Sequence, residues 1–255
     1  MVRSAPVSPD TIVYPSSDGL PMAETDFQRR PLTYAVDALD VYFQDRQDIY
    51  VSDNLFIYYE EGNPKAVVAP DVFVVIGTDK YDRSSYFLWR EPKGPDFVIE
   101  ITSRSTRTED QGPKRETYAF LGVAEYWQYD PTGDYLHPPL QGFQLVGQNY
   151  EPIPATPLPQ MGLSLHSRVL NLDLRLKQGR LYVYDPATRQ PLRSLREAEQ
   201  DRQQAEQDRQ AAETARQEAE IARQAAEEQA RREAVARQTA EARIAELEAR
   251  LRELE

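Results

Sequence analysis

The composition of the chain changes sharply at Leu195, and this change limits what the chain can fold into. The segment 195–255 consists mainly of Ala, Glu, Gln and Arg and contains neither Gly nor Pro. Helix propensity is high in such a sequence. The segment therefore predicts one long polar helix, roughly 90 Å in length at 1.5 Å per residue. Residues 1–194 remain to form a folded unit with a core of its own.

The predicted helix carries a seven-residue repeat that is compatible with two structures. Alanine recurs every seven residues from Ala198 to Ala226, and the same register resumes at Ala240 and continues to Leu247 and Leu254. Coiled coils prefer larger side chains than alanine at the seam. We expect either a weak coiled coil, firmest near the C-terminus and able to join copies into a homo-oligomer, or a solvated single helix held by Glu–Arg pairs.

The scarcity of Cys and His limits the metal chemistry of the chain. There is no cysteine, and the two histidines are His137 and His166. Disulfides and thiolate metal sites are therefore excluded, and a His-rich zinc site is disfavoured. A metal in this chain would be held by oxygen ligands, which favours Mg²⁺ or Mn²⁺.

Hydropathy and net charge limit the cellular locations and the binding partners that are possible for the chain. No apolar run approaches the length of a membrane-spanning helix, and residues 1–17 lack the apolar core of a signal peptide. We therefore expect a cytoplasmic protein with no membrane partner. The net charge of −12 is unfavourable for a nucleic-acid binder, because backbone recognition relies on Lys and Arg. Screening limits each charge to roughly 10 Å, however, so local charge decides.

The pattern before Leu195 predicts an α+β core, a mixed β-sheet with flanking helices. Residues 1–20 are rich in Pro, Ser and Asp and are expected to form a flexible arm, followed by the folded domain at 21–194. Residues 31–43 have helical spacing, with Pro31 as the first helical residue. Strands or hairpins are expected within residues 49–62, 67–77, 85–89, 95–101, 125–131, 142–153 and 170–186.

The two most apolar predicted strands are followed by a polar loop and a helix. PDVFVVI and PDFVIEI are nearly continuous apolar runs, typical of central strands covered on both faces. Residues 102–112 are predicted to be a polar loop. Pro113 then opens a helix that Gly122 caps.

Glu100 is the most informative residue of the apolar strands. It lies between Ile99 and Ile101, where burying a carboxylate is costly unless it is paired, protonated or bound to a metal. The simpler interpretation is a strand-end glutamate that pairs with Arg104. Asp71 begins the other apolar strand, and on its own it is compatible with a strand-initiating turn.

Strand geometry selects Asp71 as the partner of Glu100. Asp96 lies on the same strand as Glu100, four residues away, which is about 13 Å at 3.3 Å per residue and too far for one ion. Neighbours on paired strands are roughly 5 Å apart, and a divalent ion fits between them. Residues 77–94 are long enough to allow antiparallel pairing of the two strands. The pair Asp71 and Glu100 is therefore the predicted ion site.

A positive charge can reach this site from the next helix. Thr102 faces the same side as Glu100 but offers only a hydroxyl, whereas Lys114 is in the first turn of the helix. Tyr118 shares the helical face of Lys114. Lys114 can orient a water or stabilise a phosphate; taken alone, it is equally compatible with an ordinary solvated lysine.

Residues 67–131 resemble the bacterial Uma-two family of restriction endonucleases, which is similar to the PD-(D/E)XK nuclease superfamily. The matching segment is VVAPDVFVV…GPDFVIEITSRSTRTEDQGPKRETYAFLGVAEYWQYDP. The resemblance is looser over 21–67 and does not include the C-terminal helix. It implies that Asp71 and Glu100 are the two acids of the motif. Thr102 stands where the superfamily has its lysine, and the family places that lysine where Lys114 is found. Glu24 matches the additional acid of the first helix.

The resemblance implies a Mg²⁺-dependent endonuclease that hydrolyses nucleic acid, with DNA as the expected substrate. Asp71, Glu100 and the Ile101 carbonyl would hold the ion. Three arginines beside the site would contact phosphates or merely serve solubility: Arg104, Arg107 and Arg115. Two alternatives stay open. One is an inactive nuclease-fold scaffold that acts through its C-terminal coiled coil, and the other is a nucleic-acid binder without cleavage.

Overall fold

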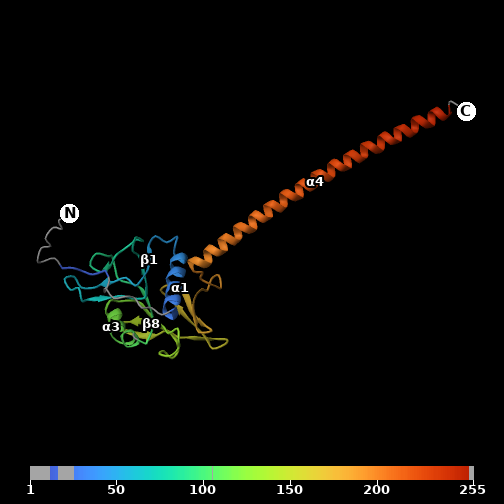
Figure 1. Cartoon of the computed structure of the whole chain (residues 1–255). Helices are drawn as coiled ribbons and strands as arrows, with labels where there is room; N and C mark the ends of the chain where they lie inside the picture. The colour runs from blue at the N-terminus through green and yellow to red at the C-terminus, as the bar shows by residue number, and fades with distance from the viewer. Residues whose placement is uncertain (1–11, 17–25, 105, 253–255) are drawn as a thin grey trace, which may run out of the picture. The chain divides into compact units, whose positions relative to one another are not determined.

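The computed structural model describes residues 12–16, 26–104 and 106–252 (Figure 1). The chain divides into two compact units, Met1–Arg196 and Glu197–Glu255, and each is described by itself. Among the described residues, no helix combines the length and apolar character needed to cross a membrane.

The first unit is an α+β domain, which confirms the predicted fold class. Its largest sheet is mixed, because every neighbouring pair of strands is antiparallel except β6 and β7. Its strands, in spatial order, are β1 (Ile49–Asp53), β4 (Val72–Ile76), β6 (Phe97–Ile101), β7 (Glu125–Tyr129), β8 (Leu140–Val146) and β9 (Asn149–Pro152). β4 and β6 are interior strands with nearly continuous burial, as their apolar runs predicted.

Two further sheets and three helices complete the described part of this unit. The antiparallel sheet of five strands consists of β10 (Thr156–Leu158), β11 (Gly162–Ser167), β12 (Leu172–Lys177), β13 (Arg180–Asp185) and β14 (Gln190–Pro191). The small sheet consists of β3 (Val67–Val68), β2 (Ile57–Tyr58) and β5 (Tyr86–Phe87). The helices are α1 (Asp26–Tyr42), α2 (Arg107–Gln111) and α3 (Pro113–Phe120).

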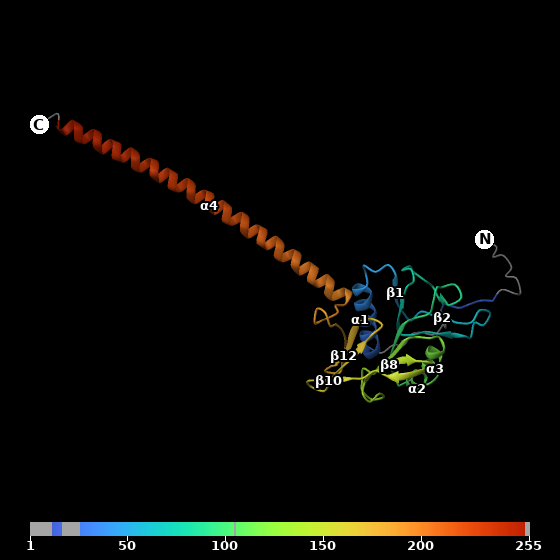
Figure 2. The same ribbon diagram turned by 180° about the vertical axis from the view of Figure 1, so that it is seen from behind.

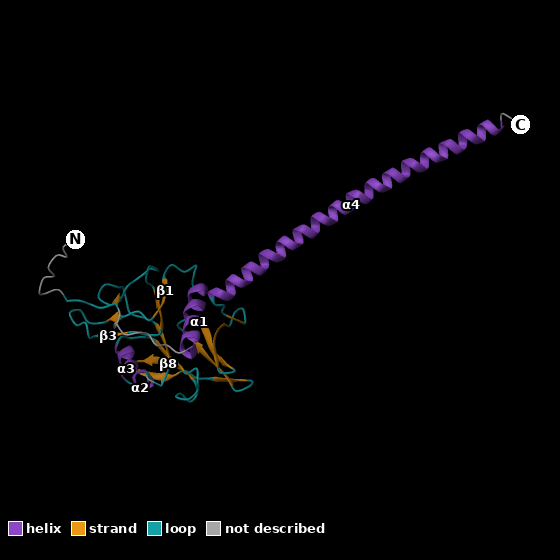
Figure 3. Ribbon diagram, in the orientation of Figure 1, coloured by secondary structure: helices purple, strands orange, loops and turns teal. Residues whose placement is uncertain are grey.

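Different elements cover the two faces of the six-stranded sheet. In Figures 2 and 3, α1 and α3 lie on opposite sides of β8. Successive side chains of a strand point to opposite faces. Ile99 and Ile101 thus join a core with α1 and the five-stranded sheet, whereas Val98 joins a second core with Tyr118 of α3. We call these the α1 face and the α3 face.

The structure corrects two details of the predicted helices. α1 begins five residues before Pro31, so this proline lies inside the helix and is not its first residue. The segment 102–112 was predicted to be a loop, but it contains the short helix α2. The predicted arm 1–20 lies outside the described residues except for 12–16, where the ring of Tyr14 packs against Tyr58 with centroids 5.0 Å apart.

Gly142 is essential to the packing of β8 against β7. It is the register partner of Trp127, which is fully buried, and a Cβ at this position would lie 2.7 Å from the indole Cζ3 atom. We predict that Gly142→Ala lowers the free energy of unfolding by about 1–3 kcal/mol, the usual cost of overpacking. Urea denaturation measures this.

Gly94→Ala is the matched control for this substitution. Its new Cβ would lie 3.3 Å from Cδ2 of Leu88, the end of a flexible side chain that can move aside. An unfolding midpoint of Gly142→Ala equal to that of the unsubstituted protein would contradict the overpacking.

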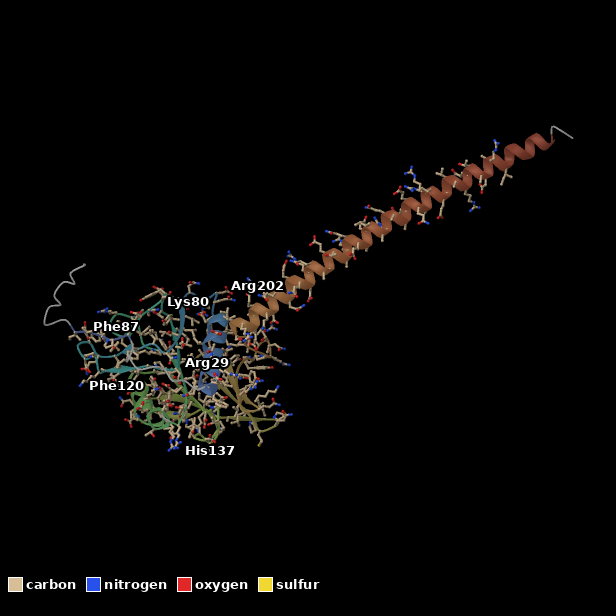
Figure 4. The ribbon with its side chains drawn as sticks, viewed as in Figure 1. Arg29, Lys80, Phe87, Phe120, His137 and Arg202 are labelled. Carbon is tan, nitrogen blue, oxygen red and sulfur yellow. The ribbon has the colours of Figure 1, made fainter. Side chains whose placement is uncertain are left out.

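The described residues of the second unit all belong to the helix α4 (Leu195–Arg252), which begins two residues before this unit. Its side chains are exposed from Asp201 to Ile244. Ion pairs follow the helix surface, such as Arg202 (labelled in Figure 4) with Glu199 and Arg223 with Glu220, each at 3.0 Å. Such pairs stabilise an isolated helix. Coiled-coil pairing of α4 stays a prediction.

Candidate functional site

Asp71 and Glu100 meet at the ends of two neighbouring central strands. β4 and β6 pair in antiparallel register with Val72 opposite Ile99, so the next position places Asp71 opposite Glu100. Residues directly opposite each other in an antiparallel pair share a face of the sheet. In addition, Asp71 Oδ2 accepts a hydrogen bond from the main-chain N–H of Ile101 at 2.6 Å.

The helix α3 supplies both donors to Glu100. Lys114 Nζ donates to Oε2 at 2.9 Å, and the Tyr118 hydroxyl donates to Oε1 at 2.6 Å. Pro113 opens α3, and Gly122, with φ of +75°, lets the chain leave it. The fully buried ring of Tyr118 anchors the helix on the α3 face, and Lys114 is one turn before it.

A second carboxylate faces the same ammonium. Asp110, at the end of α2, is 1 % exposed, and its Oδ1 lies 3.3 Å from Lys114 Nζ without a hydrogen bond of good geometry. Its Oδ2 accepts a hydrogen bond from the Thr106 hydroxyl at 2.8 Å. The main-chain oxygen of Asp110 accepts one from the buried Tyr126 hydroxyl at 2.7 Å. Lys114 therefore lies between two buried carboxylates.

Burial and charge act against each other in this cluster. Burial raises the pKa of Glu100 to about 8; Lys114 opposes the rise, whereas Asp71 and Asp110 add to it. Burial alone would lower the pKa of Lys114, but Glu100, Asp110 and Asp71 outweigh this effect and raise it. The ammonium therefore stays charged, and the Glu100 carboxyl keeps its proton up to a pH of about 8.

We predict that this site makes the free energy of unfolding depend on pH. The Glu100 carboxyl titrates near its ordinary value of 4.5 in the unfolded chain and near 8 in the folded protein. Between these values the folded protein keeps a proton that the unfolded chain has released, so raising the pH favours unfolding. Relative to Glu100→Gln, the metal-free protein should lose stability from pH 4.5 to pH 8.

Urea titrations of both proteins in a chelating buffer, repeated across this pH window, measure the effect. Glu100→Gln is the control, because glutamine has nearly the same size as glutamate but does not titrate. Parallel stability curves for the two proteins would contradict the raised pKa of Glu100.

Thr102 offers no positive charge to the site. It is 1 % exposed, its main-chain N–H donates to Tyr129 O at 2.8 Å, and its hydroxyl has no hydrogen-bond partner. The lysine that contacts Glu100 is Lys114 of α3, and the described residues between Glu100 and Lys114 include no lysine.

The three arginines differ in their surroundings. Arg104 and Arg107 are exposed, and the Arg107 guanidinium lies 5.7 Å from the ring centre of Tyr135. Arg115 is half-buried, donates to the main-chain oxygen of Tyr150 at 3.2 Å and lies 4.0 Å from the ring centre of Phe143. These contacts engage Arg115 in packing against β8 and β9.

Glu24 lies outside the described residues. Among the described residues, no group of three or more His, Cys, Asp or Glu side chains is arranged to hold a metal. The oxygen donors brought together are the side chains of Asp71 and Glu100, with the main chain of Ile101 beside them.

Sequence reasoning missed Asp110 and the role of the Tyr118 hydroxyl. Asp110 precedes Lys114 by four residues, which is the spacing of an ion pair on a helix surface. The signal was present, but residues 102–112 were interpreted as a loop. Tyr118 was placed on the helical face of Lys114, and its bond to Glu100 follows from that position.

The domain is of the α+β class, with a mixed central sheet. The sequence profile of the Uma2 family, described as "Putative restriction endonuclease", matches residues 18–177. This match spans more than half of the chain, so the chain belongs to the Uma2 family, and the resemblance drawn from residues 67–131 is confirmed.

One solved structure similar to this chain is "a putative nuclease belonging to DUF820 from Anabaena variabilis". The TM-score is 0.38 and the sequence identity is 14 %, over 54 % of this chain and 75 % of that chain. No curated protein matches the chain in sequence.

Proposed function

We propose that the chain is a cytoplasmic, Mg²⁺-dependent endonuclease that hydrolyses phosphodiester bonds of nucleic acid, with DNA as its substrate. The observation that carries this proposal is the opposition of Asp71, the residue before β4, and Glu100 on β6, with Lys114 bonded to Glu100. Membership of the Uma2 family supports the same class of chemistry.

The chemistry of the donors fits a hard divalent cation. Three carboxylates, Asp71, Glu100 and Asp110, act on one ammonium, so the cluster carries an excess of negative charge when they are ionised. Asp71, Glu100 and the Ile101 carbonyl would hold Mg²⁺ or Mn²⁺, since Mg²⁺ usually binds one or two carboxylates and keeps several waters. Bound there, the ion would polarise a phosphoryl oxygen and lower the pKa of a bound water.

The remaining tasks fall to the side chains of the chain itself. Lys114 donates a hydrogen bond to Glu100, and its side chain is 20 % exposed, so a substrate would approach it from the solvent side. A fixed positive charge stabilises the charge that develops on a phosphoryl group. The exposed guanidinium groups of Arg104 and Arg107 would hold neighbouring phosphates of the backbone.

Incubation of the purified full chain with supercoiled plasmid tests the proposal. Nicked or linear product is expected with Mg²⁺ or Mn²⁺ and is expected to disappear with a chelator. Single-stranded DNA and RNA in parallel reactions define the substrate. Complete stability of all these nucleic acids in both metals would overturn the assignment.

A scaffold that acts through α4 is the second candidate function. The observation that favours it is that both oxygens of Glu100 already accept hydrogen bonds, from Lys114 and Tyr118. The seven-residue apolar register from Ala240 to Leu254 would then pair copies of the chain. Analytical ultracentrifugation of the full chain distinguishes a monomer from such an oligomer, and a stable oligomer without any cleavage would favour the scaffold.

A further inference from the structure

Lys114 is held from two sides, by Glu100 and by Asp110, and the proposed function gives the contact with Asp110 no role in catalysis. Asp110 Oδ1 lies 3.3 Å from Lys114 Nζ. Asp110 belongs to α2 and Lys114 to α3, so the contact joins the two helices across the break between them. Lys114 Nζ has three N–H bonds, and one of them donates to Glu100. A second carboxylate beside the ammonium restricts its rotation.

Asp110 is itself fixed by contacts on several sides. Its Oδ2 accepts from the Thr106 hydroxyl at 2.8 Å, and its main-chain oxygen accepts from Tyr126 of β7 at 2.7 Å. Thr106 is in turn placed by Ser103, whose N–H donates to the threonine hydroxyl oxygen at 3.1 Å. The carboxylate thus has little freedom to move with respect to the sheet.

The burial of Asp110 indicates more than a local helix contact. Its side chain is 1 % exposed, and Oδ1 has no hydrogen-bond partner. A buried carboxylate oxygen without a hydrogen bond is unfavourable unless a nearby charge compensates it. Lys114 is the cation 3.3 Å away. The geometry therefore couples the two residues directly.

We propose that Asp110 is a positioning residue that, fixed by Thr106, holds the ammonium of Lys114 against Glu100 and leaves its remaining N–H for the phosphate of the substrate. This inference rests on the proposed nuclease function for the identity of the substrate. The positioning itself concerns only residues of this chain and can be measured without metal or nucleic acid.

Nuclear magnetic resonance of the lysine side-chain ammonium groups in the metal-free full chain tests the positioning. A slowly exchanging ¹⁵N signal that Lys114→Met removes is expected. Asp110→Asn keeps the shape and the hydrogen bond to Thr106 but loses the charge, so hydrogen exchange of this signal should accelerate about tenfold or more. Glu109→Gln, the same loss of charge on the exposed neighbouring residue, should leave the signal unchanged.

Measurements of cleavage kinetics and of Mn²⁺ affinity then distinguish a positioning role of Asp110 from a role as a metal ligand or a purely structural role. In Asp110→Asn, kcat should fall about 10–100-fold, as for residues that orient a catalytic group, with KM for DNA almost unchanged. Thr106→Val should reproduce this fall, and Thr106→Ser, which keeps the hydroxyl, should restore the rate. Mn²⁺ affinity by calorimetry should be nearly retained.

Several results would overturn the inference. They are an absent Lys114 signal in the unsubstituted protein, an unchanged signal in Asp110→Asn, or a loss of Mn²⁺ affinity of more than about tenfold, which would make Asp110 a metal ligand. A lower melting temperature with an unchanged kcat would make it purely structural. Failure of the unsubstituted protein to cleave would overturn the nuclease function, while the resonance of Lys114 would still decide the positioning.

Discussion

Replacing Glu100 with glutamine is expected to abolish metal-dependent cleavage and to leave the fold intact. Glutamine has the same shape, and its amide can still bond the Lys114 ammonium and the Tyr118 hydroxyl that contact Glu100. It removes the negative charge that would hold the cation. Loss of one preorganised group that stabilises developing charge lowers kcat by about 10²–10³-fold. Loss of a metal ligand should lower it at least as much.

Asp96→Asn is the matched control, because it removes a carboxylate from the region just before the same strand. Asp96 accepts a hydrogen bond from Ile76 N at 2.8 Å and forms an ion pair with Lys93, contacts that fix the strand end and not the site. Plasmid nicking should persist in Asp96→Asn. Equal cleavage by Glu100→Gln and the unsubstituted protein would contradict the prediction, because an ion held by Glu100 would then have no role in cleavage.

The pairing of Asp71 with Glu100 could be predicted because it depends on regular geometry. Two apolar runs predicted adjacent central strands, and the rise per residue excluded Asp96 as the partner. The antiparallel register of β4 and β6 now places Asp71 opposite Glu100. Lys114 followed from the helix-opening proline that precedes it. These steps used only local pattern and strand spacing.

Asp110 could not be found in this way, because the short helix α2 has little intrinsic stability. A single turn of five residues forms only with tertiary support. Here the tertiary support comes from the hydroxyl of Tyr126 on β7, in addition to the local hydrogen bond from Thr106 to Asp110. The sequence RTEDQ alone is equally suited to a loop. Similarly, Pro31 is tolerated within α1, although the sequence rule places proline at the first helical position.

Glu125 is a buried carboxylate whose role is structural. It is 2 % exposed and lies on the α1 face, and it joins β7 to the turn between β11 and β12. Oε1 accepts hydrogen bonds from the main-chain N–H groups of Arg168 and Val169, at 2.7 and 3.2 Å. Oε2 accepts them from the Ser167 hydroxyl and the Trp127 indole, at 2.6 and 3.1 Å. Sequence reasoning gave Glu125 no role, because its partners in residues 167–169 are about forty residues away.

Glu125→Ala is therefore predicted to be the most destabilising of the substitutions considered for the first unit. It leaves two main-chain N–H groups, a hydroxyl and an indole N–H buried without their acceptor. With about 1–3 kcal/mol for each unsatisfied donor, partly relieved by water, the loss should reach about 4 kcal/mol. The melting temperature should fall by roughly 8–16 °C for a domain of this size.

The exposed Glu151 on β9 provides the control, since Glu151→Ala removes the same group without a buried partner and should change stability by less than about 0.5 kcal/mol. Calorimetry of both variants measures the difference. A melting temperature of Glu125→Ala within about 2 °C of that of Glu151→Ala would show that the five-stranded sheet is held to β7 by apolar packing alone. The α3 face would be unaffected in either case, because Glu125 and Glu100 project from opposite faces of the six-stranded sheet.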